Sequence, residues 1–489
     1  MGLKMPEYLS EIAPAYPEIF LLIATCAVLL LDLFVKDYQR YITYIVAQAS
    51  LLFTAWLVYT ATDNATVVTT FNDMFVADPM GRVLKISIIL ITMAVFAYSR
   101  PYLKDRGMYK GELFTLGLFA VLGMMVMVSA KTMLLIYLGL ELLSLSLYAM
   151  VAFRRDNKQA SEAAMKYFVL GAIASGMLLY GMSIIYGLSG SLNLSHIATY
   201  LSSQEAVMSN LGLLLGLSFI LVGLGFKLGV VPFHMWIPDV YHGAPTAITM
   251  FLGAAPKIAV FAMVFRLLAE GLGDMVIGWQ QILVLLAALS LFVGNVIAIA
   301  QTNLKRMLAY STISHMGFVV MGILAATEAG YAASMFYIIT YAIISMGGFA
   351  VIIFLSNKES EADELADLKG LSTRHPWVAF MMLLFLFSMA GMPPTVGFYA
   401  KLSVIQAVVG ADVIWLAVFA VIMSVIGAYY YLRAIKIMYF DEADKDIAPA
   451  KAGFEFGALL SVNGLAVLGL GILPSFLMSI CVASVNAIL

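Results

Sequence analysis

Four ionisable residues stand deep inside apolar stretches of this chain. Glu141 lies in YLGLELLSLSLY, Lys227 in GLGFKLGVVPFH, Lys257 in GAAPKIAVFAMVFR and Lys401 in GMPPTVGFYAKL. An ionised group at the centre of a bilayer costs at least about 2.5–3.5 kcal/mol, so such residues usually mark an ion path or a proton relay. The alternative is that they pair only to lock helices together. Because three lysines and one glutamate share this setting, we interpret them as a proton relay.

The order of the relay follows from the residue types. A lysine beside a carboxylate holds its proton more firmly than a lysine alone in an apolar site. A pair of Lys227 and Glu141 would therefore take up a proton when the two groups are close and release it when they separate. Lys257 would then be the central carrier, and Lys401 would deliver the proton to the outer side.

His315 is a fifth candidate for the relay, and four further residues are secondary candidates. His315, in STISHMGF, lies among hydroxyl groups and could bridge Lys257 and Lys401, or it is an ordinary core histidine. His234 and His242 lie in PFHMWIPDVYHGAP and lack the third ligand that a metal site needs. Glu162 and Lys166 are four residues apart, which predicts an ion pair on one helix face, with a place at the inner proton entrance as the alternative.

The composition excludes a soluble protein. Hydrophobic residues make up 63% of the 489 residues and charged residues 11%, and the mean hydropathy is +0.97. The 27 basic and 29 acidic residues show no signature of nucleic-acid binding. The only cysteines, Cys26 and Cys481, exclude thiolate metal sites and iron–sulfur clusters on this chain. GLGFKLG lacks the third glycine of a dinucleotide fingerprint, and no Walker loop occurs. We therefore expect an integral membrane protein without a metal or cofactor of its own.

The elements that must hold the candidates are membrane-spanning helices, each needing roughly 20 apolar residues. We predict an all-α fold with fourteen spans: 16–35, 41–61, 82–99, 111–130, 132–153, 165–188, 211–242, 246–269, 279–300, 307–326, 330–355, 376–409, 413–439 and 455–483. The segment before the first span lacks the features of a signal peptide, so we expect 16–35 to be a span of the mature protein.

Basic residues in the connecting loops predict the orientation. Eighteen follow odd-numbered spans: Lys36, Arg40, Arg100, Lys104, Arg106, Lys110, Arg154, Arg155, Lys158, Lys305, Arg306, Lys358, Lys369, Arg374, Arg433, Lys436, Lys445 and Lys451. Only Lys4, Arg82 and Lys131 lie on the other side. The other six basic residues fall within spans. This asymmetry places both termini on the outer face.

Two predicted spans are too long to cross a bilayer as single helices. Residues 211–242 and 376–409 would extend about 48 and about 51 Å at roughly 1.5 Å per residue, against a core of about 30 Å. Each contains a helix breaker, Pro232 in the first and the run 391–395 (GMPPT) in the second. We predict that both helices are discontinuous.

The two broken spans hold equivalent places in two sets of five spans. The sets cover 111–271 and 279–440, with an N-terminal group at 1–110 and a last helix at 455–483. Because five is odd, the second set must be inverted relative to the first. Inverted repeats with paired broken helices are typical of transporters and indicate where the ion path lies.

Three segments carry a resemblance to a known family. GLGFKLGVVPFHMWIPDVYHGAPT, QTNLKRMLAYSTISHMGF and GMPPTVGFYAKL resemble the antiporter-like subunits of respiratory complex I, the proton-translocating NADH–quinone oxidoreductase. The resemblance covers essentially the whole chain. The N-type subunits are the most similar, because the M-type subunits generally carry glutamate where this chain has Lys401. His242 stands where some relatives have glutamine, which argues against an essential role.

The resemblance implies fourteen helices with the seventh and twelfth broken, and functional roles for Glu141, Lys227, Lys257 and Lys401. It implies a non-redox subunit of a translocase in the bacterial inner membrane, with NADH, FMN, iron–sulfur clusters and quinone on partner subunits. The expected partners are the M-type antiporter-like subunit, the small K- and J-type subunits and membrane lipids, but no nucleic acid. The main alternative is a subunit of a multi-subunit sodium/proton antiporter, and another is a quinone-binding subunit.

Overall fold

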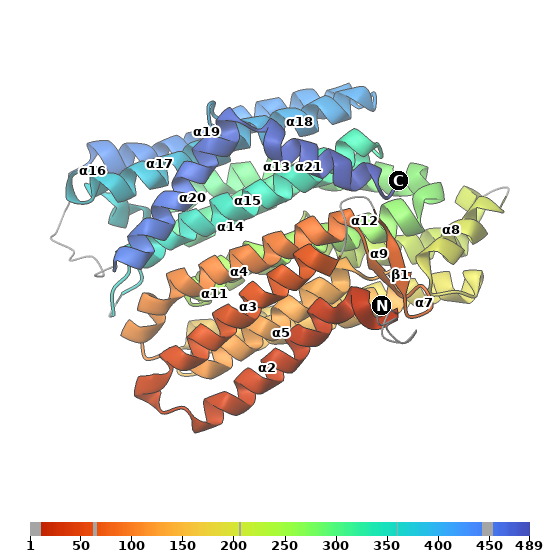
Figure 1. Ribbon diagram of the computed structural model, residues 1–489. Coiled ribbons are helices and arrows are strands. Elements are labelled where there is room, and N and C mark those ends of the chain that lie inside the picture. The colour runs from red at the N-terminus through yellow and green to blue at the C-terminus, as the bar shows by residue number, and fades with distance from the viewer. Residues whose placement is uncertain (1–10, 62–65, 205–206, 359, 443–452) are drawn as a thin grey trace.

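The computed structural model describes residues 11–61, 66–204, 207–358, 360–442 and 453–489. Lys4, Lys445 and Lys451, which we counted for the orientation, lie outside the described residues. The fold is a bundle of long helices that run roughly side by side (Figure 1).

The long helices form four consecutive groups. The first holds α2 (Tyr16–Phe34), α3 (Tyr41–Ala61) and α4 (Pro79–Asp105). The second holds α5 (Gly111–Val128), α6 (Met133–Val151), α7 (Lys158–Ser189), α9 (Leu211–Leu228), α10 (Trp236–Gly243), α11 (Thr246–Leu252) and α12 (Ala255–Phe265). The third holds α13 (Val276–Ala300), α14 (Leu304–Leu324), α15 (Glu328–Leu355), α17 (Pro376–Ala390), α18 (Val396–Gly410) and α19 (Ile414–Phe440). The last holds α20 (Phe454–Ile472) and α21 (Ser475–Asn486).

Short elements connect these helices. A β-hairpin pairs β1 (Val68–Thr70) with β2 (Phe75–Ala77) in antiparallel register. The remaining short elements are η1 (Ala13–Ala15), η2 (Asp37–Gln39), α8 (Leu194–Ser202), η3 (Val207–Ser209), the π-helix η4 (Arg266–Gly271), η5 (Gly273–Met275), η6 (Leu365–Leu368) and α16 (Leu371–Arg374).

Thirteen helices of the described chain are long and apolar enough to span a membrane. The predicted span 376–409 adds a fourteenth crossing, because it consists of α17 and α18 with 15 residues each. The predicted last span, 455–483, was wrong in one respect. It is two helices, α20 and α21, with Pro474 between them, where proline cannot continue the hydrogen bonding of α20.

Side-chain caps define where many helices begin. At the start of α4, the Asp78 carboxylate accepts a hydrogen bond from the Gly81 backbone N–H at 2.7 Å. Asn157, Asn210 and Asn303 cap α7, α9 and α14 in the same way. Such caps satisfy backbone donors that have no partner within the helix, which makes each helix start specific.

Small residues allow neighbouring helices to pack closely. A Cβ added at Gly123 in α5 would lie 2.7 Å from the carbonyl oxygen of Gly139 in α6. A Cβ at Gly181 in α7 would lie 2.7 Å from the carbonyl oxygen of Gly216 in α9. Backbone approach through small residues is a usual basis of helix association in membranes.

The centre of the bundle is formed by the segment Thr246–Gly271 together with α14 and α15. The most apolar stretch of Thr246–Gly271 is completely buried, and those of α14 and α15 are 94% and 89% buried. The corresponding stretches of α2 and α20 are only 28% buried. The central helices therefore hold the residues that are best protected from lipid.

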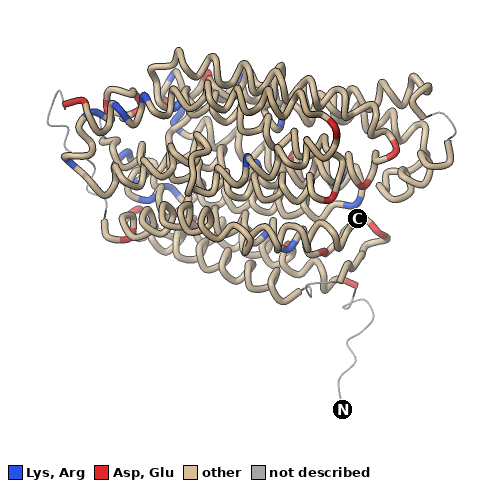
Figure 2. Tube along the Cα trace, turned by 90° about the horizontal axis from the view of Figure 1, so that it is seen from above, with Lys and Arg blue, Asp and Glu red and all other residues tan. Residues whose placement is uncertain are grey.

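Lysine and arginine gather at one end of the bundle, which we call the basic end (Figure 2). It holds the connections after α2, α4 and α6 and the segment from α15 to α17. The first and last described residues lie toward the other end, which we call the terminal end (Figure 1). A few charged residues lie between the two ends.

Two buried ion clusters join helices away from the predicted relay. Lys85 in α4 lies 2.5 Å from the Glu18 carboxylate in α2. Arg266 lies 2.5 Å from Asp78 and also forms an ion pair with Glu270. Its guanidinium donates two hydrogen bonds of 3.2 Å to the Val128 carbonyl, at the end of α5. For Lys85 and Arg266, pairing with buried carboxylates therefore explains why a charged residue lies within a predicted span.

We expect Arg266→Met to destabilise the protein by about 3–5 kcal/mol, because Asp78 and Glu270 would keep buried charges without their partner. The measurement is the thermal midpoint of the purified assembled protein. The double substitution Arg266→Met with Asp78→Asn should recover part of the loss. An unchanged midpoint in the single variant would show that the cluster contributes nothing to stability.

Candidate functional site

The two helix interruptions at the site are built alike. Gly229 follows α9 and Gly391 follows α17, with φ of 83° and 84°. This left-handed conformation is the usual end of a helix, and glycine adopts it without steric cost. A cis peptide bond before proline comes next in each, at Val231-Pro232 and Pro393-Pro394. The breaks therefore lie where the proline and glycine patterns predict them.

At each break a lysine side chain binds the carbonyl end of the interrupted helix. Lys257 Nζ donates to the Leu228 carbonyl at 2.8 Å and to the Lys227 carbonyl at 3.3 Å. Lys401 Nζ donates to the Ala390 carbonyl at 3.0 Å. The last carbonyls of a helix lack partners and carry partial negative charge, so a cation is favourable there.

An aromatic ring covers each of these ammonium groups. Lys257 Nζ lies 5.2 Å from the ring centroid of Trp236, and Lys401 Nζ lies 5.2 Å from that of Phe318. Both distances are within the range of a cation–π interaction. Helix carbonyls and a ring thus hold both lysines, and no ion pair of either lysine with a carboxylate occurs among the described residues.

Lys227 has a different partner from the one we predicted. Its ammonium donates to Ser144 Oγ in α6 at 2.8 Å. Within the described chain, Lys227 and Glu141 are not among the ion pairs closer than 4.0 Å, so the structure holds the predicted pair apart. Ser144 lies one turn after Glu141 on α6 and meets the ammonium instead. Glu141 Oε1 is buried and accepts no hydrogen bond from the described residues.

His315 belongs to a hydroxyl-rich network. Its Nδ1 lies 2.7 Å from Tyr337 Oη and its Nε2 lies 3.2 Å from Tyr431 Oη. Tyr431 Oη also lies 2.5 Å from Ser311 Oγ. The Tyr337 ring stacks on Phe318, the ring that covers Lys401. This network places His315 beside the second break.

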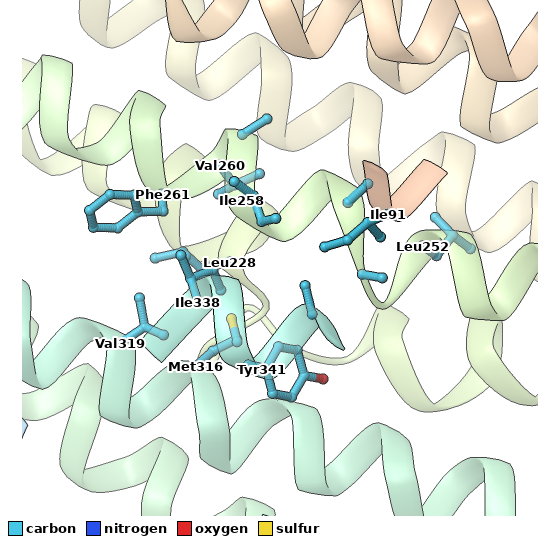
Figure 3. Packing of buried hydrophobic residues seen from close by; sticks show 14 of the residues in the cluster. Ile91, Leu228, Leu252, Ile258, Val260, Phe261, Met316, Val319, Ile338 and Tyr341 are labelled. Carbon is cyan, nitrogen blue, oxygen red and sulfur yellow. The ribbon is translucent and has the colours of Figure 1, made fainter. Parts of the chain in front are cut away.

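Buried hydrophobic side chains from α9, α12, α14 and α15 belong to the central core, and we call this group the hydrophobic layer (Figure 3). Leu228, Ile258, Met316 and Ile338 all belong to this layer and are at most 1% exposed. Ile258 follows Lys257 in the chain, and Met316 follows His315. No hydrogen bond joins that lysine to that histidine in the part of the chain that the structure describes. Hydrogen bonds between side chains therefore do not connect Lys257 with His315, and the predicted bridge to Lys401 is interrupted between these two residues.

A cavity of about 240 Å³ opens at the basic end, and we call it the basic-end cavity. It is lined by Arg154, Asn157, Gln159, Ala160, His242, Gly243, Ala244, Pro245, Asn303, Lys305, Glu361, Asp363 and Glu364. The sequence predicts Lys305 in a connecting loop, but only 1% of it is exposed. It is the second residue of α14, and its ammonium donates to the Ala244 carbonyl at 2.8 Å, where α10 ends. Lys305 is therefore the third lysine, after Lys257 and Lys401, that donates a hydrogen bond to a carbonyl at the end of a helix.

The secondary candidates lie at this end or in the first break. Lys166 lies 2.9 Å from Glu162, which confirms their predicted ion pair, and 2.8 Å from Asp239. His242 lies 3.8 Å from the Asp363 carboxylate. His234 lies in the segment between α9 and α10. The described residues include no group of three side chains suited to holding a metal ion.

Glu361 is a residue of this cavity that we did not predict from sequence. It accepts hydrogen bonds from Thr246 Oγ1 at 2.7 Å and from Tyr102 Oη, and it lies 3.5 Å from Arg106. Burial alone would raise the pKa of Glu361, but the Lys305 and Arg106 charges and these hydrogen bonds hold it below its ordinary value. The segment ESEADE contains four carboxylates, and nothing in it marks the one that tertiary packing buries.

The lowered pKa of Glu361 predicts how stability depends on pH. A carboxyl group with a lowered folded-state pKa stabilises the fold fully above its unfolded pKa of about 4.3, and this contribution is lost as the pH falls through the folded value. We expect Glu361→Gln to lower the thermal midpoint at neutral pH, and the difference from wild type to shrink below about pH 4.3. A difference that stays constant or grows with acidity would contradict the assignment.

Comparisons with known proteins agree with this geometry. Residues 130–427, more than half of the chain, match the family model described as NADH:quinone oxidoreductase/Mrp antiporter, TM. The NADH-quinone oxidoreductase subunit N of Thioalkalivibrio sulfidiphilus is 57% identical over 99% of this chain and 100% of that protein. The subunit N of Thiobacillus denitrificans is 55% identical over 99% of both chains.

Solved structures show the same fold. A chain of respiratory complex I from Thermus thermophilus is 29% identical with a TM-score of 0.81, covering 96% of this chain and 100% of that one. A chain of the Mrp complex from Dietzia has a TM-score of 0.84 but is only 19% identical, covering 98% of this chain and 97% of that one, which indicates a shared fold alone. The sequence relatives and the family match together show that this chain belongs to the NADH-quinone oxidoreductase subunit N family, the antiporter-like membrane subunits of respiratory complex I.

Proposed function

We propose that this chain translocates protons in the membrane arm of an NADH–quinone oxidoreductase. NADH oxidation and quinone reduction take place on other subunits, which hold FMN, iron–sulfur clusters and the quinone site. The observation that carries the proposal is the pair of matching helix breaks, at each of which a lysine donates to a carbonyl at the end of the broken helix. Discontinuous helices that present charged groups at the membrane interior are the usual architecture of an ion path.

In the proposed path, protons enter at the basic-end cavity and reach Glu141 and Lys227. Ser144, which receives a hydrogen bond from Lys227, lies one turn from Glu141 and supports this step. Lys257 is the next carrier. Beyond the hydrophobic layer, His315 and its tyrosine partners lead to Lys401, from which protons leave at the terminal end.

The lysine contacts suggest how proton transfer and helix movement are coupled. A protonated lysine brings a full positive charge to the partial negative charge at a helix end, whereas a neutral amine brings none. When Lys257 or Lys401 gives up its proton, its attraction to the helix end weakens. The hydrophobic layer keeps the halves of the path apart until such a movement admits water, because dry constrictions of this kind act as gates.

Paired arginines support the proposal that 111–271 and 279–440 are inverted repeats. Arg266, at the end of the first repeat, binds the Val128 carbonyl at the end of α5, the first helix of that repeat. Arg433, in the last helix of the second repeat, binds the carbonyls of Ile299 and Gln301 at 2.8 and 2.6 Å, at the end of α13. In each proposed repeat, an arginine in or directly after the last helix therefore binds carbonyls at the end of the first helix, which supports a duplication.

We place the basic end on the cytoplasmic side of a bacterial inner membrane, with both termini on the periplasmic side. The excess of lysine and arginine in the loops at that end supports this orientation. We also propose that the chain contacts the M-type antiporter-like subunit and the small K- and J-type subunits.

Purification of the assembled complex tests the proposed function. Redox subunits with flavin and iron–sulfur clusters should copurify with this chain, and NADH oxidation in proteoliposomes should drive proton uptake or release across the membrane. Copurification of membrane subunits alone, with sodium/proton exchange, would overturn the proposal. Photolabelling of this chain by a quinone analogue would instead favour a quinone-binding subunit.

A further inference from the structure

A second cavity at the basic end lies apart from the proposed path. It has a volume of about 470 Å³, within the range of about 300–1,000 Å³ that is usual for ligand sites. It lies between the connection from α2 to α3 and the connection from α4 to α5. Its lining residues are Asp37, Tyr38, Arg40, Tyr41, Lys104, Gly107, Tyr109 and Lys110. None of them is a residue of the proposed relay.

The charge of this cavity is positive. Three cations, Arg40, Lys104 and Lys110, line it with one carboxylate, Asp37, which leaves two positive charges. Asp37 is already engaged by Arg40 at 2.8 Å. Among the described residues, neither lysine has a carboxylate within 4.0 Å, and the Lys104 ammonium lies 5.3 Å from the Tyr109 ring centroid. The cavity therefore suits an anion.

Asp37 holds the Arg40 guanidinium in place, and one nitrogen of that guanidinium makes no hydrogen bond to the described residues. Its side chain is 19% exposed, and Nε donates to Asp37 at 2.9 Å. Nη1 is buried and makes no hydrogen bond to the described residues, with the Glu112 carboxylate 3.8 Å away. Guanidinium and ammonium groups bind phosphate through short, charge-assisted hydrogen bonds.

An apolar surface adjoins the cavity. Leu33 and Phe34, at the end of α2, are 75% and 86% exposed. Tyr38 and Tyr41, which line the cavity, are 74% and 47% exposed. Tyrosines at the ends of membrane-spanning helices are typical of the boundary between hydrocarbon and headgroups. A ligand that fits both features has an anionic head and hydrocarbon chains.

We propose that this cavity binds the phosphate of an anionic phospholipid from the leaflet at the basic end. Arg40, Lys104 and Lys110 contact the phosphate, and the acyl chains lie along the exposed faces of α2 and α3. Basic pockets of this kind between helices bind anionic lipid headgroups in other membrane proteins. The lipid would link the connection from α2 to α3 with the connection from α4 to α5, outside the proposed proton path.

The test compares lipid binding by two doubly substituted chains within the purified complex. Lys104→Gln with Lys110→Gln removes two charges from the cavity. Arg155→Gln with Lys158→Gln removes the same charge from the basic end outside it. The readouts are the number of phosphatidylglycerol molecules retained in native mass spectrometry and the affinity for a fluorescent phosphatidylglycerol.

We expect the cavity variant to lose one retained phosphatidylglycerol and to bind the probe about 30-fold more weakly, since each basic residue contributes about a factor of five. The control variant should match wild type, and phosphatidylcholine should not bind with comparable affinity. Equal lipid retention by both variants would overturn the proposal. So would displacement of the probe by inorganic phosphate at similar concentration, which would identify a free-ion site. If the double cavity variant does not assemble, Lys110→Gln alone supports the same comparison with Lys158→Gln.

Discussion

Lys227→Ala should abolish most proton pumping and lower the coupled quinone reductase activity by about 10- to 100-fold, with the complex still assembled. Lys227 is the buried lysine that reaches α6, through its hydrogen bond to Ser144. Alanine removes the titratable ammonium from this place and leaves Ser144 without its hydrogen-bond donor. The measurement is NADH-driven proton movement in proteoliposomes, normalised to assembled complex.

Lys158→Ala is the matched control, because that lysine is exposed at the start of α7 and has no part in the proposed path. It should leave pumping unchanged. Glu141→Gln should resemble Lys227→Ala, because an amide cannot accept the proton that Glu141 is proposed to pass on. Normal pumping in an assembled Lys227→Ala complex would remove that residue from the mechanism.

Lys401→Arg should retain more quinone reductase activity than Lys401→Ala, although both should pump less than wild type. The Lys401 ammonium binds the Ala390 carbonyl at the second break. A guanidinium still supplies a cation to that helix end, but it does not give up its proton. Alanine supplies neither the charge nor the hydrogen bond, so we expect Lys401→Ala to lose quinone reductase activity by about tenfold or more.

The same assay decides between two roles for Lys401. If the two variants lose activity equally, the residue acts only through proton transfer, and the coupling of its charge to the helix end is wrong. A thermal midpoint lowered in Lys401→Ala but not in Lys401→Arg would independently show that the cation stabilises the break.

The breaks could be predicted from sequence because they depend on local chemistry. Pro232 and the GMPPT run disrupt a helix wherever they stand, and the apolar length of the surrounding spans shows that the chain still crosses the membrane. The candidate lysines could be found for a similar reason, since a charge within an apolar stretch is conspicuous. The same reasoning applied to Pro474 would have divided the last predicted span.

The partners of these residues could not be predicted, because they depend on contacts between distant segments. Lys227 meets Ser144, 83 residues away, in place of Glu141. Lys305 lies in a predicted connecting loop, yet it is buried and binds the Ala244 carbonyl at the end of α10. Glu361 lies in an acidic segment, and its burial is set by Tyr102 and Thr246. None of these contacts produces a recognisable pattern in the sequence around either residue.

We propose that protons pass from Lys227 through Lys257 to Lys401. The most direct measurement is a structure of the assembled complex during turnover, at a resolution that shows internal water. We expect ordered water that connects Lys227 with Lys257 and crosses the layer of Leu228, Met316 and Ile338 toward His315. A layer that stays dry in every state during active pumping, with no water within hydrogen-bonding distance of Lys257, would contradict it.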